Sequence, residues 1–515
     1  MVRSQLRYKP LCYGHIISPE KCFVKQKEVC KAKLPCGIDF AAQLQYNISV
    51  ANATTNFKEC MQVDPARNAL TEGSIWKKML LFALPVLLGN IFQQFYNAFD
   101  SWTVGNFLGD DALAAVSSSG SLIFMMIGFF NGVAMGAGVI IARYFGARDY
   151  AAMRKTIHTD VAFGLASGAL LTVLGVVFTP TILKWMGTPP EVLPQSISYF
   201  RYYFCGAIFT VMYNIFVGIL HAVGDSRHPL YYLMISSAVN VALDLLFVGI
   251  FRWGVGSAAV ATTISQGISA LLCCIRLMRC DAPYQLKLKE IRFHWDSFRQ
   301  IIMHGLPSGI QNSVIAVANV VVQSNINSFG KTAMAGCGAY MKLEGFAFLP
   351  VTCFTQALST FVGQNLGAHK HDRVKKGVIF GISCSVLLAE LVGVLSYIFA
   401  PQLVALFNDH PEVVDYGTRH MRHICLFYCL LAFSHCIAAI LRGAGKSNVP
   451  MFTMLGCWCL LRVSYITIAL QFVNRLETVS IAYPITWTCS SIIFLIYYLK
   501  ADWIHAFDRQ EKKAI

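Results

Sequence analysis

The stretch ILHAVGDSRHP at residues 219–229 returns as ILRGAGKSNVP at residues 440–450. The two copies are offset by 221 residues, since 440 − 219 = 221. The same offset pairs Gly109 with Gly330, and it keeps loops and helix breakers in register over most of the chain. An offset that holds across so many breakers is typical of an internal repeat, and it predicts two similar halves around a shared interface.

The composition places both halves in a membrane. Hydrophobic residues make up 56% of the 515 residues and charged residues only 13%, and the mean hydropathy is +0.53. Apolar stretches of the roughly 20 residues that cross a bilayer recur about twelve times. We therefore predict an all-α membrane protein with twelve transmembrane helices in two six-helix lobes. Because six crossings is an even number, both lobes enter the membrane in the same direction, which implies a pseudo-twofold axis along the membrane normal.

The N-terminal region differs from the repeats. It lacks a long apolar run, and its five cysteines show no CxxC spacing of the kind that binds zinc. We expect this extension to be disordered or absent from the cell, with the functional chain starting near Met61. The predicted segments are an N-terminal extension (1–70), an N-terminal lobe (71–280), an inter-lobe linker (281–297), a C-terminal lobe (298–503) and a C-terminal tail (504–515).

Positive charge is concentrated in the even-numbered connections between the predicted helices and in the C-terminal tail. Because Lys and Arg stay on the cytoplasmic side, this bias predicts that both termini and the linker are cytoplasmic in a multi-pass protein of the plasma or inner membrane. The formal net charge of +15 is explained by these loops, so that no nucleic-acid partner is predicted. We also expect the protein to act as a monomer.

Polar side chains recur every three or four residues in the first and seventh predicted helices. In a membrane helix such a stripe must face protein or water, so two stripes related by the repeat predict a central, water-accessible cleft between the lobes. The alternative is that the amides join neighbouring helices by hydrogen bonds. Glu344, in the eighth helix, could contact a cationic solute or be neutralised by a neighbour. We assign to the substrate cleft Asn90, Gln93, Asn97, Asn319, Gln323 and Glu344.

Asp100 and Asp244 are the acidic residues deepest in the predicted helices of the first half. A charged side chain at the centre of a membrane helix costs on the order of 3 kcal/mol, so it is retained for a function or a partner. The 221-residue offset places Val321 opposite Asp100 and Tyr465 opposite Asp244, and the second half therefore lacks both acids. This asymmetry predicts an ion site in the first lobe alone.

Neutral oxygen ligands are predicted near the two acids. Asn240 lies four residues before Asp244 and hence on the same helix face, and Thr262 adds a hydroxyl. Burial and mutual repulsion favour proton uptake by a pair of acids, and the same oxygens suit Na⁺, a hard cation. We predict H⁺ or Na⁺ as the coupling ion, with no metal site or other cofactor. The alternative is that both acids are structural acceptors at helix ends near the outer surface.

Seven short segments occur in order along residues 71–503 at the predicted helices. They are ALP at 83–85, DSWTVG at 100–105, LAAV at 113–116, GDS at 224–226, NVALD at 240–244, GLP at 305–307 and GQNLGA at 363–368. Taken together, these segments resemble the multidrug and toxic compound extrusion (MATE) family of secondary transporters. The resemblance implies twelve helices in two lobes, a V-shaped cleft that opens alternately to each side, and export of cationic or amphipathic compounds against inward H⁺ or Na⁺.

The site residues of the family's prokaryotic DinF-like branch match this sequence. Members of that branch have an acid in helix 1, an Asn and an acid in helix 5, and a Thr in helix 6, and the resemblance assigns these roles to Asp100, Asn240, Asp244 and Thr262. In the NorM-like branch, acids in the seventh and tenth helices contribute to the site. This sequence departs from that pattern, because it offers only Asp415, at the edge of the tenth helix.

We therefore expect an antiporter for drugs and organic cations, with these solutes and the lipid bilayer as its partners, and not an enzyme. One alternative is a flippase for a lipid-linked saccharide, from the same superfamily. Flippases usually have extra helices and a basic cleft, whereas the stripes here contain amides and acids and little arginine. Another alternative is a membrane-embedded transferase. The acid pair Asp110-Asp111, however, lacks the DDxxD spacing that holds Mg²⁺ on a diphosphate.

Overall fold

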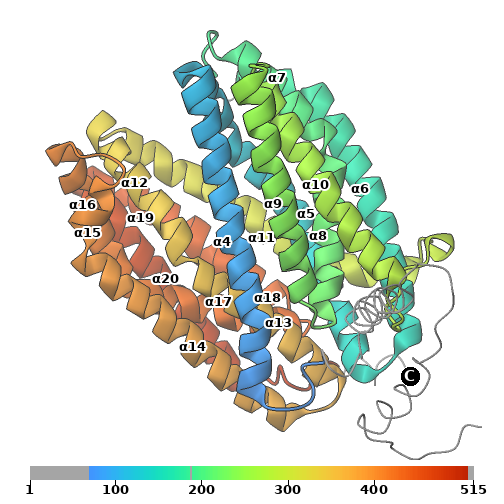
Figure 1. Cartoon of the computed structure of the whole chain (residues 1–515). Helices are drawn as coiled ribbons and strands as arrows, with labels where there is room; N and C mark the ends of the chain where they lie inside the picture. Colours follow the sequence, from blue (N-terminus) through green and yellow to red (C-terminus); the bar gives the residue numbers. More distant parts are fainter. Residues whose placement is uncertain (1–68, 186–187, 508–515) are drawn as a thin grey trace, which may run out of the picture. The chain divides into compact units, whose positions relative to one another are not determined.

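The computed structural model describes residues 69–185 and 188–507, which belong to one compact unit formed by residues 63–515. Most of the predicted N-terminal extension, residues 1–68, lies outside the described residues. Within the described ranges the regular structure is helical throughout (Figure 1). This agrees with the all-α fold that the composition and the repeat predict.

The helices fall into two groups that correspond to the two repeats. The N-lobe contains α4 (Ile75–Leu108), α5 (Asp110–Ala147), α6 (Tyr150–Trp185), α7 (Leu193–Cys205), α8 (Ala207–Ala222), α9 (Arg227–Asp244), the π-helical segment η2 (Leu245–Ile250) and α10 (Gly256–Arg279). The linker contains the 3-10 turn η3 (Leu288–Glu290). The C-lobe contains α11 (Trp295–Asn327), α12 (Lys331–Ala347), α13 (Leu349–Gly367), α14 (His371–Ile398), α15 (Ala400–Ala405), α16 (Pro411–Ile424), the 3-10 turn η4 (Cys425–Phe427), α17 (Tyr428–Gly443), α18 (Asn448–Met454), the π-helical segment η5 (Leu455–Leu461), α19 (Arg462–Phe472) and α20 (Leu476–Lys500).

The number of membrane spans agrees with the sequence. In the described ranges, 11 helical segments are long and apolar enough to cross a membrane, and there are 12 if the bent pair α7–α8 forms one span. The pair bends by 46° around Gly206, where a Cβ atom would overlap Thr263 of α10. The 221-residue offset places Phe427 opposite Gly206, and there η4 interrupts the corresponding helix of the C-lobe. The two repeats therefore share an interruption at the same position of the corresponding span, at Gly206 in the N-lobe and at η4 in the C-lobe.

The two copies of the repeated stretch form the same helix end. Gly224 after α8 and Gly445 after α17 have φ of 88° and 73°, a left-handed conformation that residues with a Cβ atom rarely adopt. In both copies the amide of the residue after the glycine donates to the carbonyl five residues earlier, at 2.8 Å. This is the hydrogen bond of a Schellman cap, and it explains why both copies keep the glycine.

Helix α4 contributes to both lobes. Met79, Phe82 and Val86, in its first half, are buried among side chains of the C-lobe, mainly from α13 and α17. Further along the helix, Gly89 lies beside Leu233 of α9 in the N-lobe. Figure 1 shows α4 (blue) running from the group of N-lobe helices to α13 and α14. The first span therefore ties the two lobes together.

Repeat-related residues also join the lobes across the pseudo-twofold axis. A Cβ atom at Gly146 in α5 would overlap the backbone of Gln364 in α13, and one at Gly367 in α13 would overlap the backbone of Arg143 in α5. The 221-residue offset relates Gly146 to Gly367 and Arg143 to Gln364, so each contact is the image of the other. Such a close backbone approach requires small residues at the crossing point.

Short segments before α4 and after α20 are part of the packed structure. Leu70 is 2% exposed, and its amide donates to Gln364 Oε1 at 2.8 Å. Phe507 is 3% exposed, and its ring centroid lies 4.2 Å from the guanidinium carbon of Arg143. The sequence assigned Leu70 to the disordered extension and Phe507 to the cytoplasmic tail. Both residues are buried because they cover apolar side chains of the C-lobe.

Candidate functional site

The four residues predicted to form the coupling site gather in the N-lobe. Asp100 on α4 is 9% exposed, and Asn240 and Asp244 on α9 are 1% and 0% exposed. The two carboxylates lie close enough to interact electrostatically. Asn240 and Thr262 line a pocket between α4, α9 and α10 with a volume of about 10 Å³, which is room for one water molecule or small ion.

The two carboxylates lack partners among the described residues. Neither side-chain oxygen of Asp244 nor Oδ1 of Asp100 has a hydrogen-bond partner, and the amide atoms of Asn240 also have none. No arginine or lysine of the described ranges interacts with either acid. Structural acceptors in a protein interior accept hydrogen bonds, so this pattern is not that of the structural alternative.

Three further side chains complete the surroundings of the acids. Gln266 Nε2 donates to the Tyr96 hydroxyl at 3.4 Å. Tyr96 lies four residues before Asp100, and Gln266 lies four after Thr262, so helical spacing could have identified both. Tyr199 on α7 lies within electrostatic reach of both acids, and no pattern in the sequence marks it.

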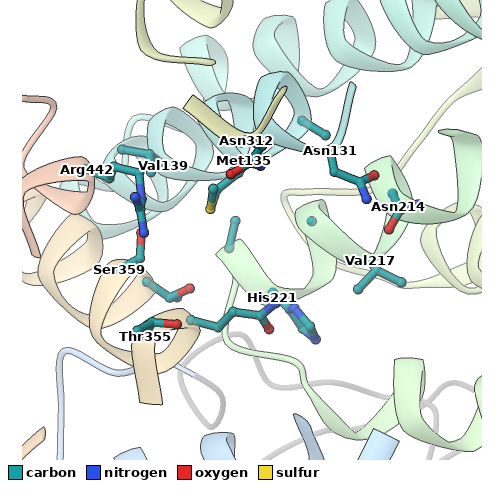
Figure 2. Close-up of a pocket in the computed structure, with 16 residues that line it drawn as sticks. Asn131, Met135, Val139, Asn214, Val217, His221, Asn312, Thr355, Ser359 and Arg442 are labelled. Atoms are coloured by element: carbon teal, nitrogen blue, oxygen red, sulfur yellow. The ribbon is translucent and has the colours of Figure 1, made fainter. Parts of the chain in front are cut away.

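A larger cavity lies between the lobes, with a volume of about 280 Å³ (Figure 2). Its walls come from α5 and α8 of the N-lobe and from α11, α13 and α17 of the C-lobe. A cavity shared by both lobes is the usual place for the substrate of a transporter built from repeats. Its lining residues are Asn131, Ala134, Met135, Gly138, Val139, Asn214, Val217, Gly218, His221, Ala222, Asn312, Thr355, Gln356, Ser359, Thr360 and Arg442.

None of the six predicted cleft residues lines this cavity. Asn90 donates to Thr352 Oγ1 at 3.1 Å and so joins the two lobes, as the helix-joining alternative predicts. Gln323 donates to Asn327 on its own helix at 2.8 Å. Both amides are engaged by the protein, and neither lines this cavity.

The remaining three predicted amides, Gln93, Asn97 and Asn319, are exposed. Asn312, two helical turns before Asn319, is the residue of the seventh span that lines the cavity. The cavity therefore borders the polar stripe of the seventh span at Asn312, and it does not reach the six residues assigned to the substrate cleft. The reason is that α4, which carries the first stripe, packs on α9 and α13, and the N-lobe wall comes from α5 and α8.

Glu344 faces the interior of the C-lobe and does not line the inter-lobe cavity. It interacts with the Tyr340 hydroxyl and lies within electrostatic reach of Arg462. Arg462 is 2% exposed, and its guanidinium carbon lies 4.5 Å from the ring centroid of Tyr483. The second possibility named for Glu344, neutralisation by a neighbour, is the one that the structure shows.

Replacing Glu344 by Gln should destabilise the protein, because Arg462 would keep its charge in the interior without the opposing carboxylate. Loss of one partner of a buried charge pair costs about 3 kcal/mol. Thermal and denaturant unfolding of the purified protein in detergent would measure the loss. The double variant Glu344→Gln, Arg462→Met should recover part of it, and a single variant as stable as the wild type would contradict the pairing.

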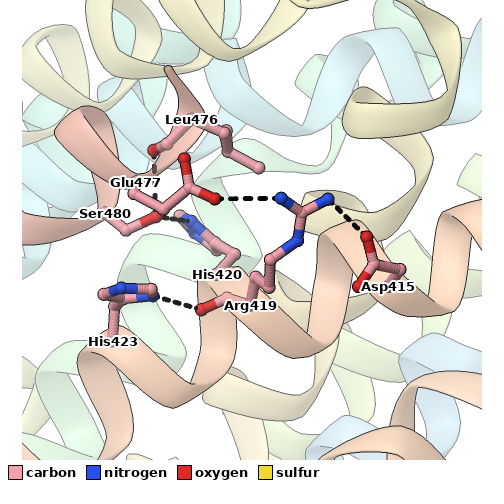
Figure 3. Close-up of polar contacts among 7 residues, drawn as sticks. All are labelled: Asp415, Arg419, His420, His423, Leu476, Glu477 and Ser480. Carbon is pink, nitrogen blue, oxygen red and sulfur yellow. Dashed lines mark hydrogen bonds and ion pairs between the residues drawn. The ribbon is translucent and has the colours of Figure 1, made fainter. Parts of the chain in front are cut away.

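Asp415, the acid that the NorM-like pattern would use, lies at the surface. Arg419 of α16 stands between Asp415 and Glu477 of α20, and it donates to both, to Glu477 at 3.1 Å (Figure 3). The Asp415 side chain is 59% exposed. The nearby His420 is buried and hydrogen-bonded to Ser480 at 2.7 Å. An exposed carboxylate that is already paired with arginine is poorly suited to hold a coupling ion.

Replacing Asp415 by Asn should therefore leave transport close to that of the wild type. An exposed ion pair stabilises a protein by about 1 kcal/mol or less, so the change in unfolding free energy should also be small. Ion-driven efflux by membrane vesicles, together with the unfolding temperature of the purified variant, would check both points. A large loss of efflux at unchanged stability would place an ion site in the C-lobe.

The chain is similar in sequence to known membrane transporters along both repeats. The MatE family model matches residues 85–246 and 307–468, one match in each lobe. The chain is 28% identical to the probable multidrug resistance protein YoeA of Bacillus subtilis over 436 residues, which cover 82% of this chain and 94% of that protein. It is 24% identical to a FAD transporter of Shewanella oneidensis over 430 residues, 82% of this chain and 93% of that protein.

Solved structures show the same fold. A MOP superfamily transporter from Pyrococcus furiosus superimposes with a TM-score of 0.81 at 21% identity, over 86% of this chain and 99% of that one. An outward-facing MATE family multidrug transporter superimposes with a TM-score of 0.80 at 22% identity, over 87% and 99% of the two chains. The matches extend over both repeats and all the spans between them, and the chain therefore belongs to the MatE family of membrane transporters and is not an enzyme.

Proposed function

We propose that this protein is a secondary active antiporter that exports amphipathic small molecules by alternating access, driven by H⁺ or Na⁺ moving inward. The observation that carries the proposal is the pair Asp100 and Asp244. Both are buried in the N-lobe and lack an opposing charge among the described residues, and neither lines the cavity between the lobes. An ion site and a solute cavity at separate places are what an exchange of unlike cargoes requires.

The N-lobe site supplies the coupling. Carboxylate, amide and hydroxyl oxygens from Asp100, Asp244, Asn240 and Thr262 are suitable ligands for Na⁺, and the carboxylates alone can take up H⁺. The Thr262 hydroxyl donates to the Ala258 carbonyl at 3.1 Å, so its oxygen lone pairs stay available to a cation. One charge that enters down the membrane potential gains about 2.3 kcal/mol per 100 mV, enough to drive uphill export of a solute.

Movement of the lobes would connect the two sites. Besides the contacts of α4, close backbone contacts between the lobes lie in the second half of α5 and the first half of α11, and at the α5–α13 crossing. On the predicted topology this is the cytoplasmic end of the bundle. Backbones meet there at glycines, and only a few side-chain hydrogen bonds cross between the lobes, such as Gln364 Nε2 to the Ala222 carbonyl at 2.7 Å, so one lobe can rock against the other by breaking few polar contacts. α4 contacts both lobes and also carries Asp100, so ion binding on α4 can bias their relative position.

The cargo proposal rests on the cavity and on the family. Relatives carry the names of multidrug resistance proteins and of a FAD transporter. The resemblance implies cationic or amphipathic cargo, and the described lining residues include no carboxylate that would favour a cation. We therefore propose amphipathic small molecules that are not restricted to cations. One arginine among the lining residues is not the basic cleft that the flippase alternative predicts.

Everted membrane vesicles would test the proposed function. Because the cytoplasmic face of an everted vesicle points outward, vesicles that contain the protein should accumulate a fluorescent dye in their lumen when a pH or Na⁺ gradient is imposed, and accumulation should stop when an ionophore collapses the gradient. Vesicles without the protein serve as the control. Transport that persists without any ion gradient, or no transport of any amphipathic dye, would refute ion-coupled export.

We further propose a monomer in the plasma membrane with both termini in the cytoplasm. The charge bias of the connections supports this topology. Reaction of a membrane-impermeant reagent with a tag at the C-terminus, in intact cells and in everted vesicles, would test it. Labelling of the tag in intact cells would show that the C-terminus lies outside the cell, opposite to the proposed orientation.

A further inference from the structure

Arg442 lies at the wall of the inter-lobe cavity without a partner. It is 7% exposed, it lines the cavity, and its Nε atom has no hydrogen-bond partner. The next residue, Gly443, brings α17 close to α13, since a Cβ atom there would lie 2.6 Å from the Ser359 carbonyl oxygen. Figure 2 shows the Arg442 side chain beside Ser359 at one edge of the cavity.

A buried guanidinium without an opposing charge is costly. Several kcal/mol are lost when a charge leaves water, and proteins usually offset this loss with a carboxylate or a bound anion. The described cavity lining contains no Asp or Glu, and the residue that the repeat pairs with Arg442 is His221, also in the lining. The cavity therefore carries donors and positive charge, and no acid to neutralise them.

The two walls of the cavity differ in polarity. On α5 the lining residues include Ala134, Met135 and Val139, which are apolar. The 221-residue offset relates these positions to Thr355, Gln356 and Thr360 on α13, which also line the cavity and are polar. At these three pairs of positions the N-lobe presents apolar side chains and the C-lobe polar ones. The N-lobe side also includes Asn131, Asn214 and His221, so the apolar surface is the part of α5 formed by Ala134, Met135 and Val139, and Arg442 lies on the C-lobe side.

We propose that this cavity binds an amphipathic organic acid, whose carboxylate or phosphate pairs with Arg442 and whose apolar body lies against α5. Guanidinium groups bind carboxylate and phosphate oxygens through two parallel hydrogen bonds, and the hydroxyls of Ser359 and Thr360 can add donors beside Arg442. This inference rests on the proposed transport function and specifies the cargo. The structural alternative is that Arg442 only stabilises the last turn of α17 through the helix dipole.

A matched pair of dyes tests the inference without any mutation. Fluorescein carries a carboxylate, and its methyl ester differs in that group alone. Fluorescence anisotropy with the wild-type protein in phosphatidylcholine nanodiscs should show fluorescein binding about tenfold or more tightly than the ester. Equal affinities for the two dyes would overturn the proposal even if every variant of Arg442 failed to fold.

Variants then locate the interaction. Arg442→Gln should weaken fluorescein binding about tenfold to a hundredfold, and Arg442→Lys should restore part of the affinity. Binding of the cationic dye tetramethylrhodamine methyl ester should not weaken. Lys446→Gln removes a charge four residues away, outside the cavity lining, and should leave fluorescein affinity unchanged. Equal losses for both dyes in Arg442→Gln would assign Arg442 to the structural role instead.

Two further results separate the inference from the function on which it rests. If wild-type proteoliposomes transport the cationic dye under an ion gradient and fluorescein neither binds nor moves, the proposed transport function is supported and the proposed organic-acid site is refuted. If fluorescein binds through Arg442 but no dye is transported under any ion gradient, the proposed organic-acid site is supported and ion-coupled export is refuted. The lipid control replaces part of the phosphatidylcholine by phosphatidylglycerol. If this replacement abolishes fluorescein binding in the wild-type protein and has no effect in Arg442→Gln, the site binds a lipid headgroup, and the proposal of a soluble cargo is overturned.

Discussion

Asp244→Asn should reduce gradient-driven efflux to the level of vesicles without the protein, while the variant still inserts into the membrane. Asp244 is fully buried, and both of its oxygens lack partners among the described residues. Asparagine has nearly the same shape but can neither release a proton nor neutralise Na⁺. The amide should therefore fit the site and abolish its exchange of ions, which is the step that drives the cycle.

Asp100→Asn should have the same effect, because the two carboxylates interact and act as one site. The measurement is the initial rate at which everted vesicles accumulate dye under an imposed pH or Na⁺ gradient, which corresponds to efflux from the cell. Dye binding by the purified variants should persist, because neither acid lines the inter-lobe cavity. Asp415→Asn is the matched control, since it removes an acid that is exposed and already paired. Undiminished efflux by both N-lobe variants would remove these acids from the coupling role.

The second large effect is expected at the crossing of α5 and α13. Leucine in place of Gly146 or Gly367 cannot fit beside the backbone of the other helix, so the two helices must separate. Overpacking of this kind costs about 1–3 kcal/mol, and more where the neighbouring atoms are backbone and cannot rotate away. Because the contact closes one end of the bundle, the arrangement with that end closed should lose stability relative to the one with it open.

A cycle that passes through a state destabilised by this amount should slow about tenfold or more. Efflux rate and unfolding temperature should both fall for Gly146→Leu and for Gly367→Leu, and similarly for the two, because the pseudo-twofold axis makes their surroundings alike. Gly338→Leu is the matched control, since that helical glycine has open space where its Cβ atom would lie. Wild-type rates in both crossing variants would show that transport does not require this contact.

The proximity of the residues in the candidate coupling site was largely predictable, because each of them is marked by local sequence. A carboxylate in an apolar run stands out wherever the helix lies, and the four-residue spacing between Asn240 and Asp244 fixes their common face. The structure places Asp100 and Thr262 near them, on α4 and α10. Tyr199 was not predictable, because it belongs to another helix and has no spacing relation to the two acids.

The lining of the inter-lobe cavity and the surroundings of Glu344 could not be predicted from the sequence. Polar residues at helical spacing indicate that a helix has a polar face, but they do not say what that face meets. The stripe on α4 meets α13 at Asn90 and is exposed further along, while Glu344 meets Tyr340 and Arg462 inside its own lobe. Arg442 could not be assigned to the cavity, because its position follows from the close approach of α17 to α13.

The duplicated pattern, the twelve apolar runs and the acids within them were legible in the order of the residues, since chain length across a bilayer and the cost of a buried charge are local properties. Which faces meet was settled by helix packing. Glycine contacts set how closely α5, α11 and α13 approach, and that approach decides which side chains border the shared cavity. No stretch of sequence contains this information, because it arises from contacts between residues more than 150 positions apart, such as Gly146 and Gln364, which 364 − 146 = 218 positions separate.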